Sequence, residues 1–157
     1  GELRQTVEAQ LPDGMRILRR TLIGHSFGGL FTVNAVLTQP YAFDDFIAAD
    51  PSFWWDQRRL IQKAAADGLG DKAAAGPGRR LYLGFATKPR KDRTGSADRP
   101  AAGARLSADP LVSDFIGKLQ SQGLQVRRQD FLDEVHGTVM FPALFDALKH
   151  FYTRELS

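Results

Sequence analysis

The sequence predicts an α/β protein in which helices cover both faces of a parallel β-sheet. Segments with helical periodicity alternate with short apolar runs along the whole chain. These runs lack the in–out alternation of half-exposed strands, as expected for strands that are buried on both faces. Strands that are separated by helices pair in parallel, and the helices lie on the sheet. The length of 157 residues fits a single domain, residues 1–157.

The first half of the chain is expected to alternate helices with strands. Leu3, Val7 and Leu11 have the i, i+4, i+8 spacing of one helical face, and Pro12 ends that helix. The apolar run TLI belongs to the first strand, and FIAA is the centre of the second. The helix between these two strands is closed by Pro40. The expected bounds are helix 2–11, strand 16–24, helix 28–39, strand 43–50 and helix 57–67.

The second half continues the alternation after a Gly-rich connection. Asp109 is a suitable N-cap and Pro110 a suitable first residue for one helix, which Gly123 ends. The segment 87–109 has no apolar periodicity and is rich in Pro, Gly and Arg. It is therefore expected to be a long loop that lines the entrance of a site. The expected bounds are strand 80–86, helix 109–122, strand 124–132 and helix 138–156.

The composition excludes several functional classes. The chain has no cysteine, which removes disulfides, thiolate metal sites and cysteine nucleophiles. The formal net charge of +3 is small and no nucleic-acid recognition motif is present, so nucleic acid is not an expected partner. No apolar stretch reaches the length of about 18 residues that a membrane span needs. No metal and no cofactor are expected, and the compartment is left open between cytoplasm and periplasm.

Several features are expected at one edge of the sheet. In parallel α/β sheets, ligands bind at the carboxyl ends of the strands. Ser26, Asp50, the segment 87–109 and the segment around His136 each follow the carboxyl end of an expected strand. A functional site is therefore predicted at this edge.

Ser26 is the predicted nucleophile. It lies in the sequence GHSFG, a G-x-S-x-G pattern that follows a strand and opens a helix. Small flanking residues, Gly24 and Gly28, avoid clashes in the sharp turn that exposes such a serine. The backbone N–H of Phe27 is then expected to be one donor of an oxyanion hole. The alternative is a tight turn in which Ser26 only caps the helix.

His136 is the predicted general base. A serine hydroxyl is a poor nucleophile unless a base takes its proton during the attack. Of the three histidines, His136 lies between the last strand and the last helix, as the chain order serine, acid, histidine requires. His150 belongs to the final helix, and His25 lies inside the turn beside Ser26. The alternative for His136 is an ordinary surface-loop histidine.

Asp92 is the predicted acid that orients the imidazole. Such a residue is expected after the strand 80–86, within reach of the base. Asp98 and Asp109 are the other candidates, although Asp109 has a competing role as a helix cap. A serine–histidine pair without an acid is a further alternative.

Substrate binding is assigned to residues on either side of Ser26. Trp54 and Trp55 follow the second strand and would form an aromatic wall for an acyl or aryl group. The alternative is that they cover the end of the core. His25 is placed beside them, as a residue that packs next to the reacting centre.

The segments IGHSFGGLFTVNAVLTQPYAFDDFIAADPSFWWD and FLDEVHGTVMFPALFDALKHFY resemble an esterase family of α/β hydrolases. This family contains the bacterial siderophore trilactone esterases. The likeness covers most of residues 15–152 and is weakest across 87–109. It implies that Ser26 corresponds to the family's nucleophile and His136 to its base, whereas the acid has no clear counterpart.

The resemblance implies that the chain is the C-terminal half of an α/β-hydrolase fold. It is expected to lack the N-terminal strands, and the N-terminal half is then a required partner. The implied function is a serine esterase that acts on small-molecule carboxylic esters, siderophore-like or small acyl esters, through an acyl-enzyme. One alternative is an acyltransferase that uses the same residues. Another is a non-catalytic α/β-hydrolase-like domain that binds a partner.

Overall fold

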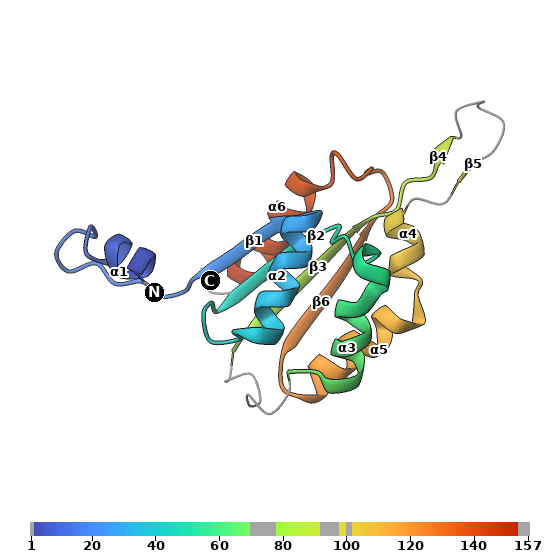
Figure 1. Ribbon diagram of the computed structural model, residues 1–157. Coiled ribbons are helices and arrows are strands. Elements are labelled where there is room, and N and C mark those ends of the chain that lie inside the picture. Colours follow the sequence, from blue (N-terminus) through green and yellow to red (C-terminus); the bar gives the residue numbers. More distant parts are fainter. Residues whose placement is uncertain (1, 70–77, 92–97, 100–101, 154–157) are drawn as a thin grey trace.

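The computed structural model describes residues 2–69, 78–91, 98–99 and 102–153. The elements are α1 (Glu2–Glu8), β1 (Thr21–His25), α2 (Phe27–Thr38), β2 (Asp45–Ala49), η1 (Trp55–Arg58), α3 (Arg59–Asp67), β3 (Arg80–Ala86), β4 (Arg90–Lys91), β5 (Asp98–Arg99), α4 (Ala102–Ser107), α5 (Pro110–Ser121), β6 (Gln125–Phe131) and α6 (Met140–Tyr152). Four strands form a parallel sheet in the order β1-β2-β3-β6, which confirms the predicted sheet (Figure 1).

Helices cover both faces of this sheet, as predicted. On one face, α2, α3 and α5 pack over Phe46 and Leu83 (Figure 1). On the other face, α6 packs over Ile47 and Tyr82. Because neighbouring residues of a strand point to opposite faces, Phe46 and Ile47 contribute to two separate cores. The two central strands, β2 and β3, are thus buried on both sides, which explains their apolar sequences.

Most expected elements are present with slightly different ends. β3 has the predicted bounds. The first strand begins at Thr21 rather than at residue 16, because its pairing with β2 starts where β2 itself begins, at Asp45. Asp109 caps α5 by accepting a hydrogen bond of 3.0 Å from the N–H of Leu111, as predicted. Among the described helices, none combines the length and the apolar character that a membrane span requires.

The prediction of an unstructured loop at 87–109 is wrong for the described part of this segment. It contains β4 and β5, which pair antiparallel with each other, and the helix α4. Each of these elements is too short to show a period in the sequence. In α4, Gly103 is buried, and a Cβ built on it would lie 2.5 Å from Oδ1 of Asp50. The end of the segment therefore reaches the carboxyl edge of the sheet.

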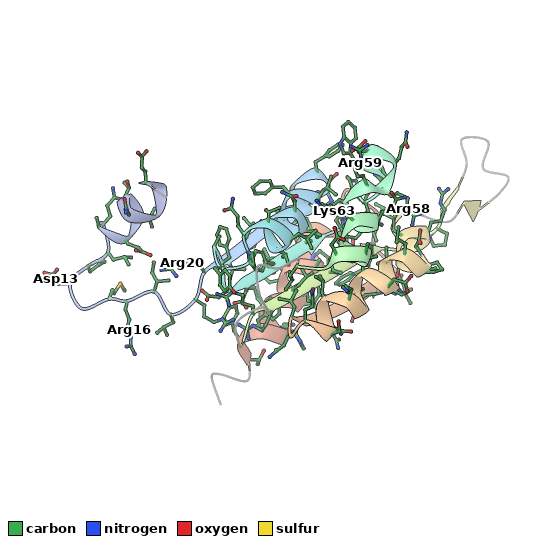
Figure 2. All side chains as sticks on the ribbon, turned by 60° about the horizontal axis from the view of Figure 1, so that its bottom comes forward. Asp13, Arg16, Arg20, Arg58, Arg59 and Lys63 are labelled. Atoms are coloured by element: carbon green, nitrogen blue, oxygen red, sulfur yellow. The ribbon has the colours of Figure 1, made fainter. Side chains whose placement is uncertain are left out.

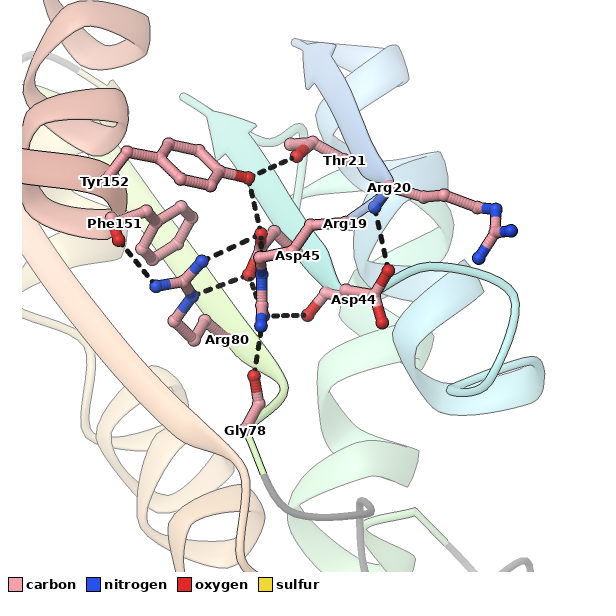
Figure 3. Close-up of polar contacts among 9 residues, drawn as sticks. All are labelled: Arg19, Arg20, Thr21, Asp44, Asp45, Gly78, Arg80, Phe151 and Tyr152. Atoms are coloured by element: carbon pink, nitrogen blue, oxygen red, sulfur yellow. Dashed lines mark hydrogen bonds and ion pairs between the residues drawn. The ribbon is translucent and has the colours of Figure 1, made fainter. Parts of the chain in front are cut away.

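A buried network fixes the opposite, amino end of the sheet (Figure 3). Asp45 is fully buried at the start of β2 and accepts two hydrogen bonds of 2.8 Å from Arg19. It also accepts bonds of 2.6 and 3.0 Å from Arg80, and one of 2.6 Å from the hydroxyl of Tyr152. Burial alone would raise the pKa of Asp45, but the bonds from Arg19, Arg80 and Tyr152 outweigh it and lower the pKa from 3.8 to about 2.

Candidate active site

Ser26 lies in a strained turn between β1 and α2. Its φ of 59° and ψ of −118° are rare for a residue with a side chain. A Cβ built on Gly24 would lie 2.0 Å from the carbonyl oxygen of Gly28, so the turn requires glycine at position 24. A Cβ on Gly28 would meet none of the described atoms within 4 Å, so the expected steric need for glycine there is not seen. The Ser26 side chain makes no capping hydrogen bond to α2, unlike the helix-cap alternative.

The imidazole of His136 reaches this serine from the loop between β6 and α6. Its Nε2 lies 3.0 Å from Oγ of Ser26, within the distance that a general base requires. Two backbone hydrogen bonds hold the start of this loop against the end of β3: Thr87 N–H donates to Phe131 O, and Lys88 N–H to Glu134 O. The predicted proximity of Ser26 and His136 is therefore present.

Asp50 lies on the other side of the imidazole. Its Oδ2 lies 2.6 Å from Nδ1 of His136, and its Oδ1 accepts a hydrogen bond of 3.2 Å from the N–H of Ala86. Asp50 is only 4% exposed and follows β2 directly, with a positive φ of 42°. Its own N–H donates to the carbonyl of Gly84 at 2.7 Å. The backbone of β3 thus fixes this carboxylate from two directions.

The three side chains form one directed chain of hydrogen bonds. An ionised carboxylate only accepts, so Asp50 selects the tautomer of His136 that carries its proton on Nδ1. The lone pair of Nε2 then faces Ser26 and can take the hydroxyl proton. In chemical terms, this arrangement can activate a serine oxygen for attack on a carbonyl carbon.

The structure corrects the predicted position of the acid, because Asp50 occupies the place beside Nδ1 that Asp92 was expected to fill. Asp92 itself lies outside the described residues, and Asp98 belongs to β5. Asp109 pairs with Arg58 and caps α5. Burial raises the pKa of Asp109, but its hydrogen bonds from Arg58 and the Leu111 N–H lower it overall, as in a structural ion pair.

A signal for Asp50 was present in the sequence. Asp50 directly follows the buried strand β2, which pairs with the strand that carries Ser26 at its end. The expected chain order places the acid after β3, whereas Asp50 lies after β2 at the same edge of the sheet. Ser52, which contacts Oγ of Ser26 at 3.2 Å, was also missed as a member of the site.

His25 contacts the loop of the base rather than an open cleft. Its Nε2 lies 2.7 Å from the backbone carbonyl oxygen of His136, and the centroids of the two rings are 4.6 Å apart. A carbonyl oxygen only accepts, so Nε2 of His25 carries the proton of this hydrogen bond. This contact ties the turn of Ser26 to the loop of His136, and a substrate-binding role for His25 stays a prediction.

An aromatic surface lies next to the turn. Phe27, Trp54 and Trp55 make edge-on contacts with one another, with ring centroids 5.1 to 5.9 Å apart. Trp54 and Trp55 are 54% and 53% exposed, so they do not seal the core. Phe27 and Trp55 also line a surface groove of about 420 Å³, whose lining includes Asp56 and the two cations Arg59 and Lys63. Figure 2 shows these two cations on the side of the body formed by η1 and α3.

The parallel sheet, the strand–serine–helix turn and the histidine after the last strand are the features of an α/β hydrolase. A siderophore enterobactin esterase of Emericella nidulans is 32% identical to the chain in an alignment of 151 residues, and the match covers 90% of this chain and 50% of that protein. A siderophore triacetylfusarinine C esterase of Aspergillus fumigatus is 39% identical over 41% of this chain and 22% of its own length.

The fold comparison agrees with these sequence matches. The solved structure of the siderophore hydrolase EstA from Aspergillus nidulans superposes with a TM-score of 0.70 and 28% identity, over 94% of this chain and 53% of its own. No family model matches the sequence. The chain is therefore similar to siderophore esterases and hydrolases, and its structure corresponds to part of an α/β-hydrolase fold. These two matches extend over most of this chain, but the chain spans only about half the length of each relative. Fungal and bacterial proteins are both among the relatives.

Proposed function

We propose that the chain is the nucleophile-bearing half of a serine esterase that hydrolyses carboxylic esters through an acyl-enzyme. The observation that carries this proposal is the linear arrangement of Ser26, His136 and Asp50, with contacts of 3.0 and 2.6 Å. These are hydrogen-bond distances from nucleophile to base and from base to its orienting acid. The names of the relatives, which are esterases or hydrolases, support the same reaction class.

Each half of the reaction uses the same proton carrier. In acylation, Oγ of Ser26 attacks the ester carbon while its proton moves to Nε2 of His136. The imidazolium then gives this proton to the leaving alkoxide, and an alcohol departs. In deacylation, His136 takes a proton from water, and the hydroxide attacks the acyl carbon. The proton returns to Ser26 as the carboxylic acid leaves. Asp50 stays ionised throughout and stabilises the imidazolium.

The N-terminus of α2 would stabilise the charge that develops on the substrate oxygen. The first N–H groups of a helix have no partner within the helix, and they point toward an anion placed at its end. Phe27 is the first residue of α2, directly after Ser26. Its N–H is therefore the proposed oxyanion donor from this chain.

Siderophore-like or small acyl esters are the proposed substrates. The relatives are named for enterobactin and triacetylfusarinine C. In this chain, Phe27, Trp54 and Trp55 offer half-exposed rings beside the nucleophile, which suit an aryl or acyl group. Lys63 on the neighbouring groove would attract an anionic part of the ligand, whereas Arg59 in the same groove is paired with Asp56.

The proposed enzyme also needs an N-terminal half of the fold. β1 forms an edge of the sheet, so the outer side of its ladder has no neighbouring strand within the described part of the chain. Ile23 on this strand and Phe141 and Phe145 on α6 are exposed apolar side chains. A further strand and helix at this edge would pair β1 and cover them. The same half would supply a second oxyanion donor. The status of residues 1–157 as one domain is likewise a prediction.

Covalent labelling tests the proposed function. A fluorophosphonate probe is applied to the protein in the full length that its gene encodes. We expect Ser26 alone to be labelled, and Ser26→Ala to lose both labelling and about 10⁴-fold or more of the ester turnover. Ser113→Ala changes an exposed serine of α5 and is the control, which should keep both. Labelling that survives Ser26→Ala would disprove the proposal.

A further inference from the structure

A second serine hydroxyl lies against the proposed nucleophile. Oγ of Ser52 is 3.2 Å from Oγ of Ser26, and Ser52 is only 2% exposed. A buried hydroxyl requires a hydrogen-bond partner. In the described part of the chain, the side-chain contact recorded for Ser52 is this one with Ser26. None of the sequence patterns assigns a role to it.

The backbone fixes Ser52 in this position. Its N–H donates to the carbonyl of Ser26 at 3.1 Å, and its own carbonyl accepts from the N–H of Trp55 at 3.0 Å. The preceding residue, Pro51, packs closely on α2, because a Cβ built on Gly29 would lie 3.1 Å from its Cα. The turn that carries the nucleophile and the loop that carries Ser52 are therefore joined directly.

The direction of the contact follows from the chain of hydrogen bonds. Asp50 accepts the Nδ1 proton of His136, so Nε2 carries only a lone pair toward Ser26. The single hydroxyl proton of Ser26 must then point to Nε2, at 3.0 Å. This leaves Oγ of Ser26 with only lone pairs toward Ser52. The hydroxyl of Ser52 must therefore be the donor in this pair.

We infer that Ser52 is a further catalytic residue, whose hydroxyl donates a hydrogen bond to Oγ of Ser26 throughout the reaction. This inference rests on the proposed function. As the proton of Ser26 moves to His136, negative charge grows on Oγ before the bond to the acyl carbon is complete. The Ser52 hydroxyl stabilises that charge without losing its own proton. It acts again when Oγ leaves the acyl group in deacylation.

Ser52→Ala in the full-length protein tests this inference. The substitution removes the donor and leaves a side chain that is slightly smaller. We expect the rate of fluorophosphonate labelling and kcat for a p-nitrophenyl ester to fall by about threefold to tenfold, the equivalent of one ordinary hydrogen bond. KM and the thermal midpoint should stay close to the wild type. Ser52→Thr keeps the hydroxyl and should recover most of the rate.

Ser107→Ala is the matched control for loss of a buried hydroxyl. Ser107 is also 2% exposed, but it is bonded to Asp130 and Arg128 instead of to Ser26. Its loss should leave the labelling rate unchanged. An equal or higher rate in Ser52→Ala than in the wild type would overturn the inference and leave the proposed function standing. Absence of Ser26-dependent labelling in the wild type would instead reject the proposed function itself.

Discussion

Two aspartates at opposite ends of β2 have contrasting surroundings. Asp45, at the start of the strand, accepts hydrogen bonds from two arginines and a tyrosine. Asp50, just past its end, accepts one from the N–H of Ala86 and one from His136. Both aspartates are almost fully buried, with 0% and 4% exposure. Burial alone therefore does not distinguish the carboxylate of the Asp45 network from the one beside the proposed general base.

The two aspartates differ in the chemistry of the side chains that donate hydrogen bonds to them. The partners of Asp45 are two permanent cations and the hydroxyl of Tyr152. Arg80 also donates to the carbonyl of Phe151 at 2.7 Å, so these donors hold backbone and side chains together. The partner of Asp50 is a histidine whose second nitrogen faces a hydroxyl. Imidazole accepts and releases a proton near neutral pH, whereas guanidinium does not. Only the second arrangement is able to pass a proton onward.

Of the substitutions that distinguish the two ends of β2, Asp50→Asn is expected to have the largest effect, a loss of kcat. The amide can donate to Nδ1 and thereby hold the wrong tautomer of His136, with the proton on Nε2. In another enzyme with a serine–histidine–aspartate triad, this substitution lowers kcat by about 10⁴-fold, and we expect a loss of that order. The thermal midpoint should change little. Steady-state ester hydrolysis by the full-length protein measures the effect.

Asp92→Asn is the matched control for this prediction. It removes the carboxylate that the sequence favoured as the acid, and kcat should stay within about twofold of the wild type if Asp50 has the role. A large loss in Asp92→Asn together with near-normal turnover in Asp50→Asn would restore the sequence-based assignment.

Asp45→Asn should show the opposite pattern, with a loss of stability instead of activity. It leaves Arg19 and Arg80 without their buried counter-charge. Breaking a buried ion pair in this way typically costs about 3–5 kcal/mol of unfolding free energy. Urea unfolding measures this loss, and kcat of the folded fraction should be retained. A stable Asp45→Asn variant with impaired kcat would show that the amino end of the sheet also governs the chemistry.

The pH dependence of stability gives a second test of the Asp45 network. The folded-state pKa of Asp45 is about 2, below the ordinary value of 3.8. A depressed pKa contributes stability that is present in full above pH 3.8 and is lost as the pH falls through about 2. The wild type should therefore lose unfolding free energy over this window. Asp45→Asn should lose less over the same window, because the titrating carboxylate is gone.

Local sequence patterns were sufficient to predict that Ser26 and His136 lie together. The turn at Ser26 needs a strand, small residues and a helix in direct succession, and His136 follows from chain order. Asp50 and Ser52 depend instead on the pairing of β2 with β1 and β3, which places their backbone next to Ser26 and Ala86. Apolar residues at helical spacing identify a helix, and a short apolar run identifies a strand. Neither pattern shows which strands are neighbours in the sheet. Local patterns therefore did not predict the contact between Asp50 and His136, although the sheet was predicted.

The smallest effect is expected at His25, which acts on the site through the backbone of His136. Its Nε2–H···O contact of 2.7 Å is one ordinary hydrogen bond, so His25→Phe should lower kcat by about threefold to tenfold. His25→Gln places an amide N–H near the position of Nε2 and should restore most of the rate.

The separate effects on kcat and KM distinguish the two possible roles of His25. A positioning residue changes kcat with KM nearly constant, because the loop of His136 loses its tether while the substrate surface stays intact. A substrate-binding residue, as the sequence suggested, would raise KM with kcat unchanged, and that result would contradict the positioning role.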